Sequence, residues 1–131
     1  MELINIPTKL YRVGKRIADD QGLWYDKDGN YTGLIHTVPG AAAAALPMGF
    51  DPIFRADGQR WISVTDTPAA LPNWFSRDDM RVLFPRGYDV MEIEVLRYRR
   101  FFFEGFQHEV YSKDDEISIR VLDPALIWEG W

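Results

Sequence analysis

Gln107 and Glu109 stand two residues apart in a short run with β-strand character, residues 106–113 (FQHEVYSK). Side chains alternate along a strand, so these two point to the same face. A carboxylate in such a place can stabilise the positive charge that develops on a sugar carbon as a glycosidic bond breaks. The residue two positions earlier then meets the incoming acceptor. The pair is a candidate half of an active site, and an ordinary wet strand edge is the alternative.

Two further polar spots fall on expected strands. Arg12 emerges from residues 8–13 (TKLYRV), and its planar guanidinium suits a phosphate, although a strand-end arginine that reaches solvent fits as well. Ser63 and Thr65 share a face and lead directly into an expected helix. Their small hydroxyls can hold a ribose or orient a carboxylate, but β-propensity and helix capping explain the same pattern.

Together the three spots resemble the mono-ADP-ribosyltransferases of the arginine–serine–glutamate branch. That family carries an aromatic-Arg pair on its first strand, a Ser-x-Ser/Thr segment that runs into a helix, and Glu-x-Glu or Gln-x-Glu on a later strand. The matching stretches here are LYR ending at Arg12, SVT at 63–65 and QHE at 107–109. The run FFFEGF at 101–106 resembles the substrate-recognising turn that precedes the last motif. The resemblance spans residues 10 to about 122 and implies an ADP-ribosyltransferase-like fold.

The resemblance implies a role for each residue. NAD would be the substrate, and no metal would be needed. Glu109 would hydrogen-bond the ribose 2′-hydroxyl and stabilise the oxocarbenium ion, while Gln107 would meet an acceptor, in this family one other than arginine. Arg12, with its neighbour Tyr11, would bind the nicotinamide ribose or phosphate of NAD, and Ser63 would orient Glu109. Thr65 would support the pocket floor, and Trp24 and Tyr25 would stack on nicotinamide.

The sequence departs from the family pattern in two places. Val64 stands in the middle of the Ser-x-Thr segment, where a threonine is frequent. Val13 follows Arg12, where the family commonly has a glycine, and this affects the backbone expected near the phosphates. For Trp24 and Tyr25, the core of a hairpin is an equally good interpretation.

Composition excludes several other functions. The chain has 131 residues, a net charge of −5 and 15 % aromatic residues. An acidic chain argues against general affinity for nucleic acid, and the basic run at 97–100 (RYRR) is interpreted as a solvated strand end. The absence of cysteine suits a reducing cytoplasm, and His36 and His108 are too few and too far apart for a structural zinc site. The longest apolar run is too short to span a bilayer, so no membrane partner is expected.

The order of elements predicts one α+β domain over residues 1–131, with mostly antiparallel, twisted sheet and two to three short helices. The expected strands are 8–13, 61–65, 88–98, 108–112 and 116–122, with a hairpin over 23–38, and the expected helices are 39–48, 66–75 and 76–84. The residues expected to face inward are Met91, Ile93 and Val95 in one strand and Ile117, Ile119 and Val121 in another. Ser76 is expected to cap the last helix with Asp79 as its partner, and Thr67 or Asp66 to cap the one before.

Two other functions compete with the transferase. A phage-type or mobile-element protein with this fold can block a host protein without any activity. That hypothesis predicts an exposed aromatic patch, with the terminal WEGW (128–131) or Trp74-Phe75 as candidates. The second is an NAD-degrading toxin of the Arg-Glu-Ser kind, although that group places its glutamate before its serine. The C-terminal segment is also a candidate for contact with a second subunit.

Overall fold

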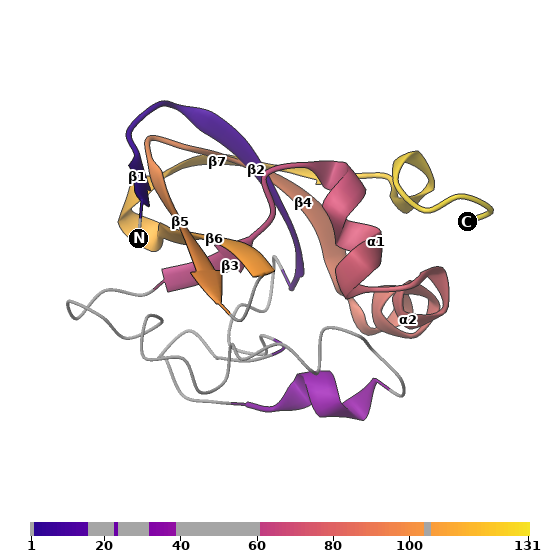
Figure 1. The fold of residues 1–131 in the computed structure, drawn as a ribbon. Coiled ribbons are helices and arrows are strands. Elements are labelled where there is room, and N and C mark those ends of the chain that lie inside the picture. The colour runs from indigo at the N-terminus through magenta and orange to yellow at the C-terminus, as the bar shows by residue number, and fades with distance from the viewer. Residues whose placement is uncertain (1, 16–22, 24–31, 39–60, 104–105) are drawn as a thin grey trace.

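The chain folds around two antiparallel sheets (Figure 1). The computed structural model describes residues 2–15, 23, 32–38, 61–103 and 106–131. One sheet has the strand order β1-β5-β6-β3 and the other the order β2-β4-β7. The strands are β1 (Glu2–Ile4), β2 (Thr8–Gly14), β3 (Trp61–Val64), β4 (Asp89–Val95), β5 (Tyr98–Phe103), β6 (Phe106–Ser112) and β7 (Glu116–Leu122).

Two short helices follow β3: α1 (Leu71–Trp74) and α2 (Arg77–Leu83). Single 3-10 turns occupy Leu34–Thr37, Pro68–Ala70, Phe84–Arg86, Lys113–Asp115 and Pro124–Leu126. These elements confirm the α+β class, the antiparallel pairing and two of the expected helices. The helix expected at 39–48 lies outside the described residues.

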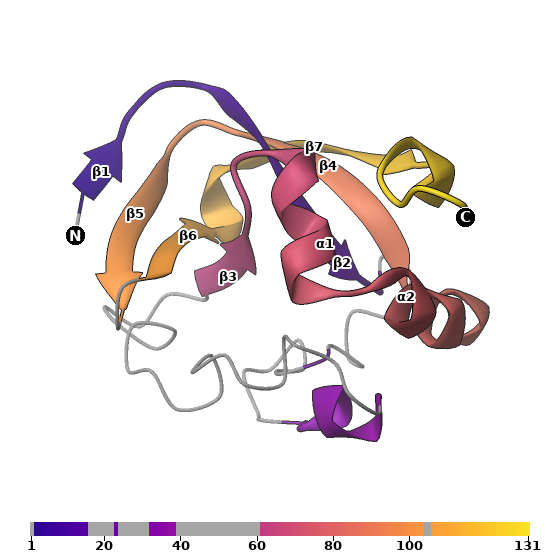
Figure 2. The same cartoon turned by 45° about the vertical axis from the view of Figure 1, so that its right-hand side comes forward.

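A sharply bent ribbon connects the two sheets. β1 pairs with β5 in one sheet, and β2 pairs with β4 in the other, so both strands of this ribbon pass from sheet to sheet. Figures 1 and 2 show the bend at one corner, between β1 and β2 and between β4 and β5. The sheets meet again where Tyr11 and Thr65 exchange backbone hydrogen bonds of 2.9 and 2.8 Å. β2 and β3 are therefore neighbours as well.

The core between the sheets confirms the alternation expected in β4. Met91, Ile93 and Val95 are buried together with Leu10 of β2. Their partners across the gap come from β3, β5 and β6 and are Ile62, Val64, Tyr98 and Tyr111. β-branched and aromatic side chains fill this space because they suit a pleated, half-buried surface.

A second core forms under the helices. Leu71 and Phe75, at α1, and Met80 and Leu83, in α2, pack on the opposite side of β2 and β4. Ser76 caps α2 in the expected capping box with Asp79. Such a box is local, since each side chain bonds a backbone N–H three residues away, which makes it visible in the sequence.

The C-terminal segment also belongs to this second core. Trp128 is buried, and its indole N–H donates to the carbonyl of Phe75 at 2.8 Å. Trp131 lies edge-on to Phe84. The aromatic patch expected at 128–131 or Trp74-Phe75 is thus wrong for Trp128 and Phe75, whose rings are covered by their own chain.

Four other expectations differ from the structure. Residues 34–37 form a 3-10 turn in place of the second strand of a hairpin, and His36 in it is exposed. Ile117 and Val121 are 48 % and 40 % exposed, not inward, because β7 is the end strand of its sheet. β1 and β5 are separate strands that the sequence did not predict. Residues 97–100 (RYRR), interpreted as a solvated end, mostly belong to β5, which is paired on both sides.

Candidate functional site

The three segments that carry the resemblance lie on three neighbouring strands. β3 pairs with β6, and β2 joins the end of β3 through Tyr11 and Thr65. Directly paired residues of antiparallel strands share a face, and their chain neighbours point the other way. Val64 pairs with Glu109, and Val64 precedes Thr65 just as Arg12 follows Tyr11. Arg12 and Glu109 therefore lie on the same face of a continuous surface.

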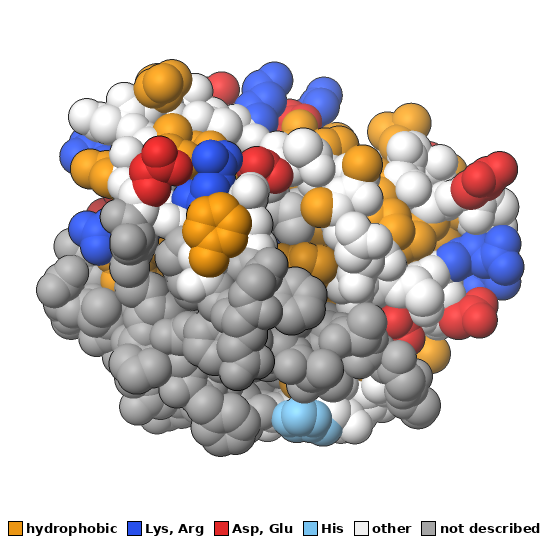
Figure 3. Space-filling model, in the orientation of Figure 1, with side chains coloured by type: hydrophobic (Ala, Val, Ile, Leu, Met, Phe, Trp, Pro, Cys, Tyr) orange, Lys and Arg blue, Asp and Glu red, His pale blue; other side chains and the backbone are white. Residues whose placement is uncertain are grey.

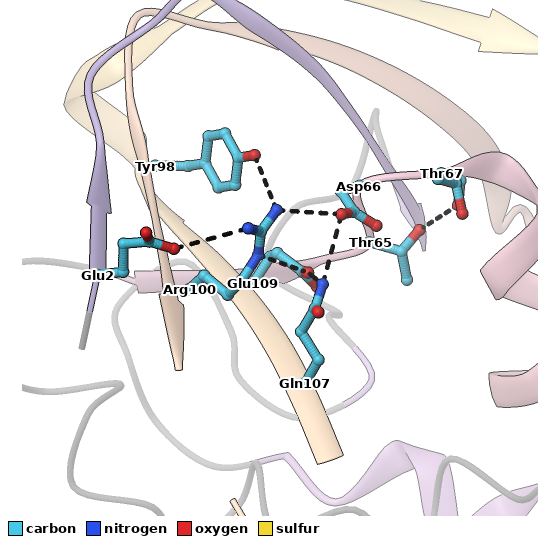
Figure 4. A network of polar contacts seen from close by, with 8 residues as sticks. All are labelled: Glu2, Thr65, Asp66, Thr67, Tyr98, Arg100, Gln107 and Glu109. Atoms are coloured by element: carbon cyan, nitrogen blue, oxygen red, sulfur yellow. Dashed lines mark hydrogen bonds and ion pairs between the residues drawn. The ribbon is translucent and has the colours of Figure 1, made fainter. Parts of the chain in front are cut away.

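Glu109 is the buried centre of a charged network (Figure 4). Its side chain is only 4 % exposed. The amide of Gln107 donates to its Oε1, and the Arg100 Nε lies 3.5 Å from the same oxygen. Arg100 and Glu109 are direct partners across β5 and β6, the spacing at which opposite charges on a sheet interact.

Asp66 forms the outer side of this network. Its Oδ2 accepts from Arg100 Nη2 at 3.2 Å and from Gln107 Nε2 at 3.4 Å. The Gln107 amide thus lies between two carboxylates, with Glu109 buried and Asp66 30 % exposed. Of the two expected caps of the following helix, Thr67 and not Asp66 stands at the N-cap of Pro68–Ala70, where its side chain makes no capping hydrogen bond.

Burial governs the ionisation of Glu109. Removal from water raises the pKa of the Glu109 carboxyl, since a charged carboxylate is poorly solvated in a protein interior. The hydrogen bond from Gln107 lowers this pKa, the charge of Asp66 raises it, and Arg100 lowers it, with a net upward shift. A carboxylate with such opposing influences, placed next to solvent-accessible polar groups, is characteristic of functional sites.

Ser63 does not face Glu109. It pairs with Val110, and its hydroxyl is hydrogen-bonded to Nε2 of His108, which lies edge-on to Trp74 with ring centroids 5.6 Å apart. Ser63 and His108 therefore lie on the opposite face of the sheet. The role expected for Ser63, orienting Glu109, disagrees with this geometry, because one residue of register moves a side chain to the other face.

The other expected site residues have varied positions. Arg12 folds back along β2, with its guanidinium close to Gly14. Tyr11 points to the other face, where its hydroxyl donates to Glu92 at 3.2 Å. Thr65 is buried, and its hydroxyl donates to the carbonyl of Thr67 at 2.8 Å. Trp24 and Tyr25 lie outside the described residues.

Sequence reasoning missed Arg100, Asp66, Tyr98 and Glu2 as site residues, although all four belong to the network. A signal for Arg100 was available in the sequence. Only two residues, one of them Gly105, separate the paired Phe103 and Phe106, and such a connection favours a tight hairpin. Counting back from that turn places Arg100 opposite Glu109. Asp66 and Glu2 gave no comparable signal, because they come from segments distant in sequence.

Within the described part of the chain, no group of three or more His, Cys, Asp or Glu side chains could hold a metal ion. No helix among these residues is long and apolar enough to cross a membrane. Comparison with known proteins gives no further guide, since no protein-family model, curated protein or solved structure matches the chain.

Proposed function

We propose that the protein is an NAD-cleaving ADP-ribosyltransferase with Glu109 at its reactive centre. The observation that carries this proposal is the shared face of Arg12 on β2 and Glu109 on β6, the two strands that flank β3. Their segments are separated by almost a hundred residues of sequence, so the resemblance in the sequence did not by itself require this arrangement.

In the proposed reaction, the bond between ribose C1′ and the nicotinamide nitrogen breaks. Nicotinamide leaves with the bonding electron pair, and C1′ becomes oxocarbenium-like. The Glu109 carboxylate stabilises that charge and holds the ribose 2′-hydroxyl, while Arg12 binds the ribose or phosphate part of NAD. An acceptor oxygen or nitrogen then bonds to C1′ and gives up its proton to solvent.

Gln107 is the proposed contact for the acceptor. It is exposed and lies above the buried Glu109. Its amide nitrogen is engaged by Glu109 and Asp66, so its carbonyl oxygen remains to accept a hydrogen bond from an acceptor N–H or O–H. We place the reaction in the cytoplasm, where a cysteine-free chain meets no oxidative requirement and NAD is available.

The test is release of free nicotinamide from NAD by the purified protein. We expect release by the wild type and a fall on the order of 100- to 1,000-fold in Glu109→Gln, the scale of losing one key electrostatic group. Glu129→Gln is the matched control, because that glutamate is exposed in the C-terminal segment far along the chain. Release that is equal in Glu109→Gln and wild type, or absent from a folded wild type, would contradict the proposal.

The same assay separates a transferase from an NAD-degrading toxin. If free ADP-ribose accumulates in step with nicotinamide, water is the acceptor. If ADP-ribose becomes attached to a protein or another cytosolic molecule, that molecule is the acceptor and identifies the transferase.

A non-catalytic binding module is the second proposal, and one observation favours it. Phe102 is 72 % exposed and is the direct cross-strand partner of Gln107. Charges of both signs are interspersed with exposed hydrophobic side chains on the face in Figure 3, so mimicry of nucleic acid is not favoured. Loss of partner binding in Phe102→Ser, with no effect of Glu109→Gln, would select the binding module.

A further inference from the structure

We propose that Arg100 is a positioning residue, which holds the Glu109 carboxylate ionised and fixed in place while NAD is cleaved. This inference rests on the proposed function and adds a residue that the three resembling segments do not contain. It starts from the position of Arg100 on β5, directly opposite Glu109 on β6.

All three nitrogens of the Arg100 guanidinium already have acidic partners. Nε lies 3.5 Å from Glu109, Nη1 lies 3.6 Å from Glu2, and Nη2 donates to Asp66 at 3.2 Å. Nη2 also lies 3.4 Å from the Tyr98 hydroxyl. Nη2 donates hydrogen bonds, while Nε makes none and is held, like Nη1, by ion-pair attraction. Contacts on several sides restrain the planar group, which in turn restrains the carboxylate beside it.

The same contacts argue against a direct role for Arg100 in binding the phosphates of NAD. Three carboxylates surround one guanidinium, which leaves this network with a net negative charge. A diphosphate would have to displace one of them and would meet the others as like charges. Arg12, on the same face two strands away, therefore remains the proposed phosphate ligand.

Loss of Arg100 would affect the charge state of Glu109 more than the arrangement of the residues around Glu109. The groups facing Glu109 are Arg100 and Gln107, which favour its ionised form, and Asp66, which opposes it. Arg12 lies on the same face further along the sheet. Burial already disfavours the carboxylate, so removal of the nearest cation leaves only the Gln107 amide to support it.

The experiment compares Arg100→Gln and Arg100→Lys with Arg99→Gln. Arg99 is the matched control because it comes from the same strand but stacks over the Trp61 ring on the opposite face, 4.5 Å from its centroid. Two readouts are recorded on proteins that retain the wild-type circular dichroism. One is the titration of the Glu109 carboxyl by ¹³C NMR, assigned by its absence from Glu109→Gln. The other is kcat and KM for nicotinamide release as a function of pH.

We expect Arg100→Gln to raise the pKa of Glu109 and to move the acidic limb of kcat to higher pH. The loss relative to wild type should be larger on the acidic side of the profile than on the alkaline side, and for a pKa raised by one it should approach tenfold at pH values well below both pKa values. KM for NAD should stay unchanged, Arg100→Lys should restore part of the limb, and Arg99→Gln should follow the wild type.

Three results would overturn the inference. If the pKa of Glu109 is unchanged in an Arg100→Gln protein that still releases nicotinamide, the role of Arg100 is wrong while the proposed function stands. A raised KM for NAD with an unmoved acidic limb would show that Arg100 binds the substrate. No nicotinamide release by any variant, wild type included, would overturn the proposed function and with it the catalytic role of Arg100.

Discussion

The two faces of the four-stranded sheet carry different kinds of polar side chain. One face carries the charged network of Arg100, Glu109 and Asp66, which reaches solvent at Asp66 and at Gln107. The other carries Ser63 and His108, which are hydrogen-bonded to each other beside the Trp74 ring, and Arg99, which stacks over the Trp61 ring.

The difference lies in how costly it is to bury each group of polar side chains. Burying a charge is costly unless it is well paired, and an apolar replacement is often as stable or more so. The proposed NAD-cleaving role would account for a network that keeps a buried carboxylate with a raised pKa. The hydrogen bond between Ser63 and His108 satisfies a buried polar pair, as is usual in a protein interior.

The largest expected effect tests the difference between the two faces most directly. Glu109→Gln should lower kcat/KM for nicotinamide release on the order of 100- to 1,000-fold. Ser63→Ala should stay within about threefold of wild type, which corresponds to less than 1 kcal/mol of transition-state stabilisation. Steady-state kinetics on both variants decides the matter. A serine variant as inactive as the glutamate variant would place Ser63 in the reactive centre, as the family resemblance implies.

The second prediction concerns stability on the face that carries Ser63 and His108. His108→Ala should lower the free energy of unfolding by about 2–3 kcal/mol, because it removes a buried ring and its hydrogen bond to Ser63. Urea titration measures the change. His36→Ala is the control, since His36 is exposed and its loss should cost no more than about 0.5 kcal/mol. Equal effects of the two substitutions would mean that His108 is not a packing residue.

The smallest effect is a pH dependence on the charged face. The pKa of Glu109 in the folded protein lies above its ordinary value, so the folded state binds this proton more tightly than the unfolded state. Protonated Glu109 therefore stabilises the folded protein at pH values below the ordinary pKa of 4.5, and this stabilisation is lost as the pH rises through the pKa of the folded state. Unfolding of wild type and Glu109→Gln across this range should show the wild type losing stability relative to the variant. A parallel pair of curves would mean that burial does not shift this group.

Local features of this fold can be predicted from the sequence. The capping box of Ser76 and Asp79 and the alternation of Met91, Ile93 and Val95 depend on neighbours within a few residues, and both are confirmed. The acidic run at Lys113–Asp115 favours a turn, and a 3-10 turn forms there, but it leads from β6 in one sheet to β7 in the other and does not close a hairpin.

Features that depend on register or on distant partners are harder to predict. Whether Ser63 shares a face with Glu109 is decided by a single residue of offset between β3 and β6. A basic run looks alike whether it is solvated or paired, so Arg100 is distinguished from its neighbour Arg99 by counting the register back from the turn after Phe103 and not by the run itself. Ile117 and Val121 alternate as core residues do, but alternation does not show that a strand lies at the end of its sheet.

The bent ribbon that joins the sheets has a consequence for synthesis of the protein. β2 finds its partner β4 about eighty residues later, as the Tyr11–Glu92 contact illustrates with a separation of 81. Contacts between residues so far apart in sequence slow folding. During translation β2 remains an unpaired apolar strand until β4 has left the ribosome. Lys9 and Arg12 interrupt that strand with positive charge, as gatekeeper residues do in segments prone to aggregation. The arginine proposed to bind NAD in the folded protein would thus also keep the nascent chain soluble.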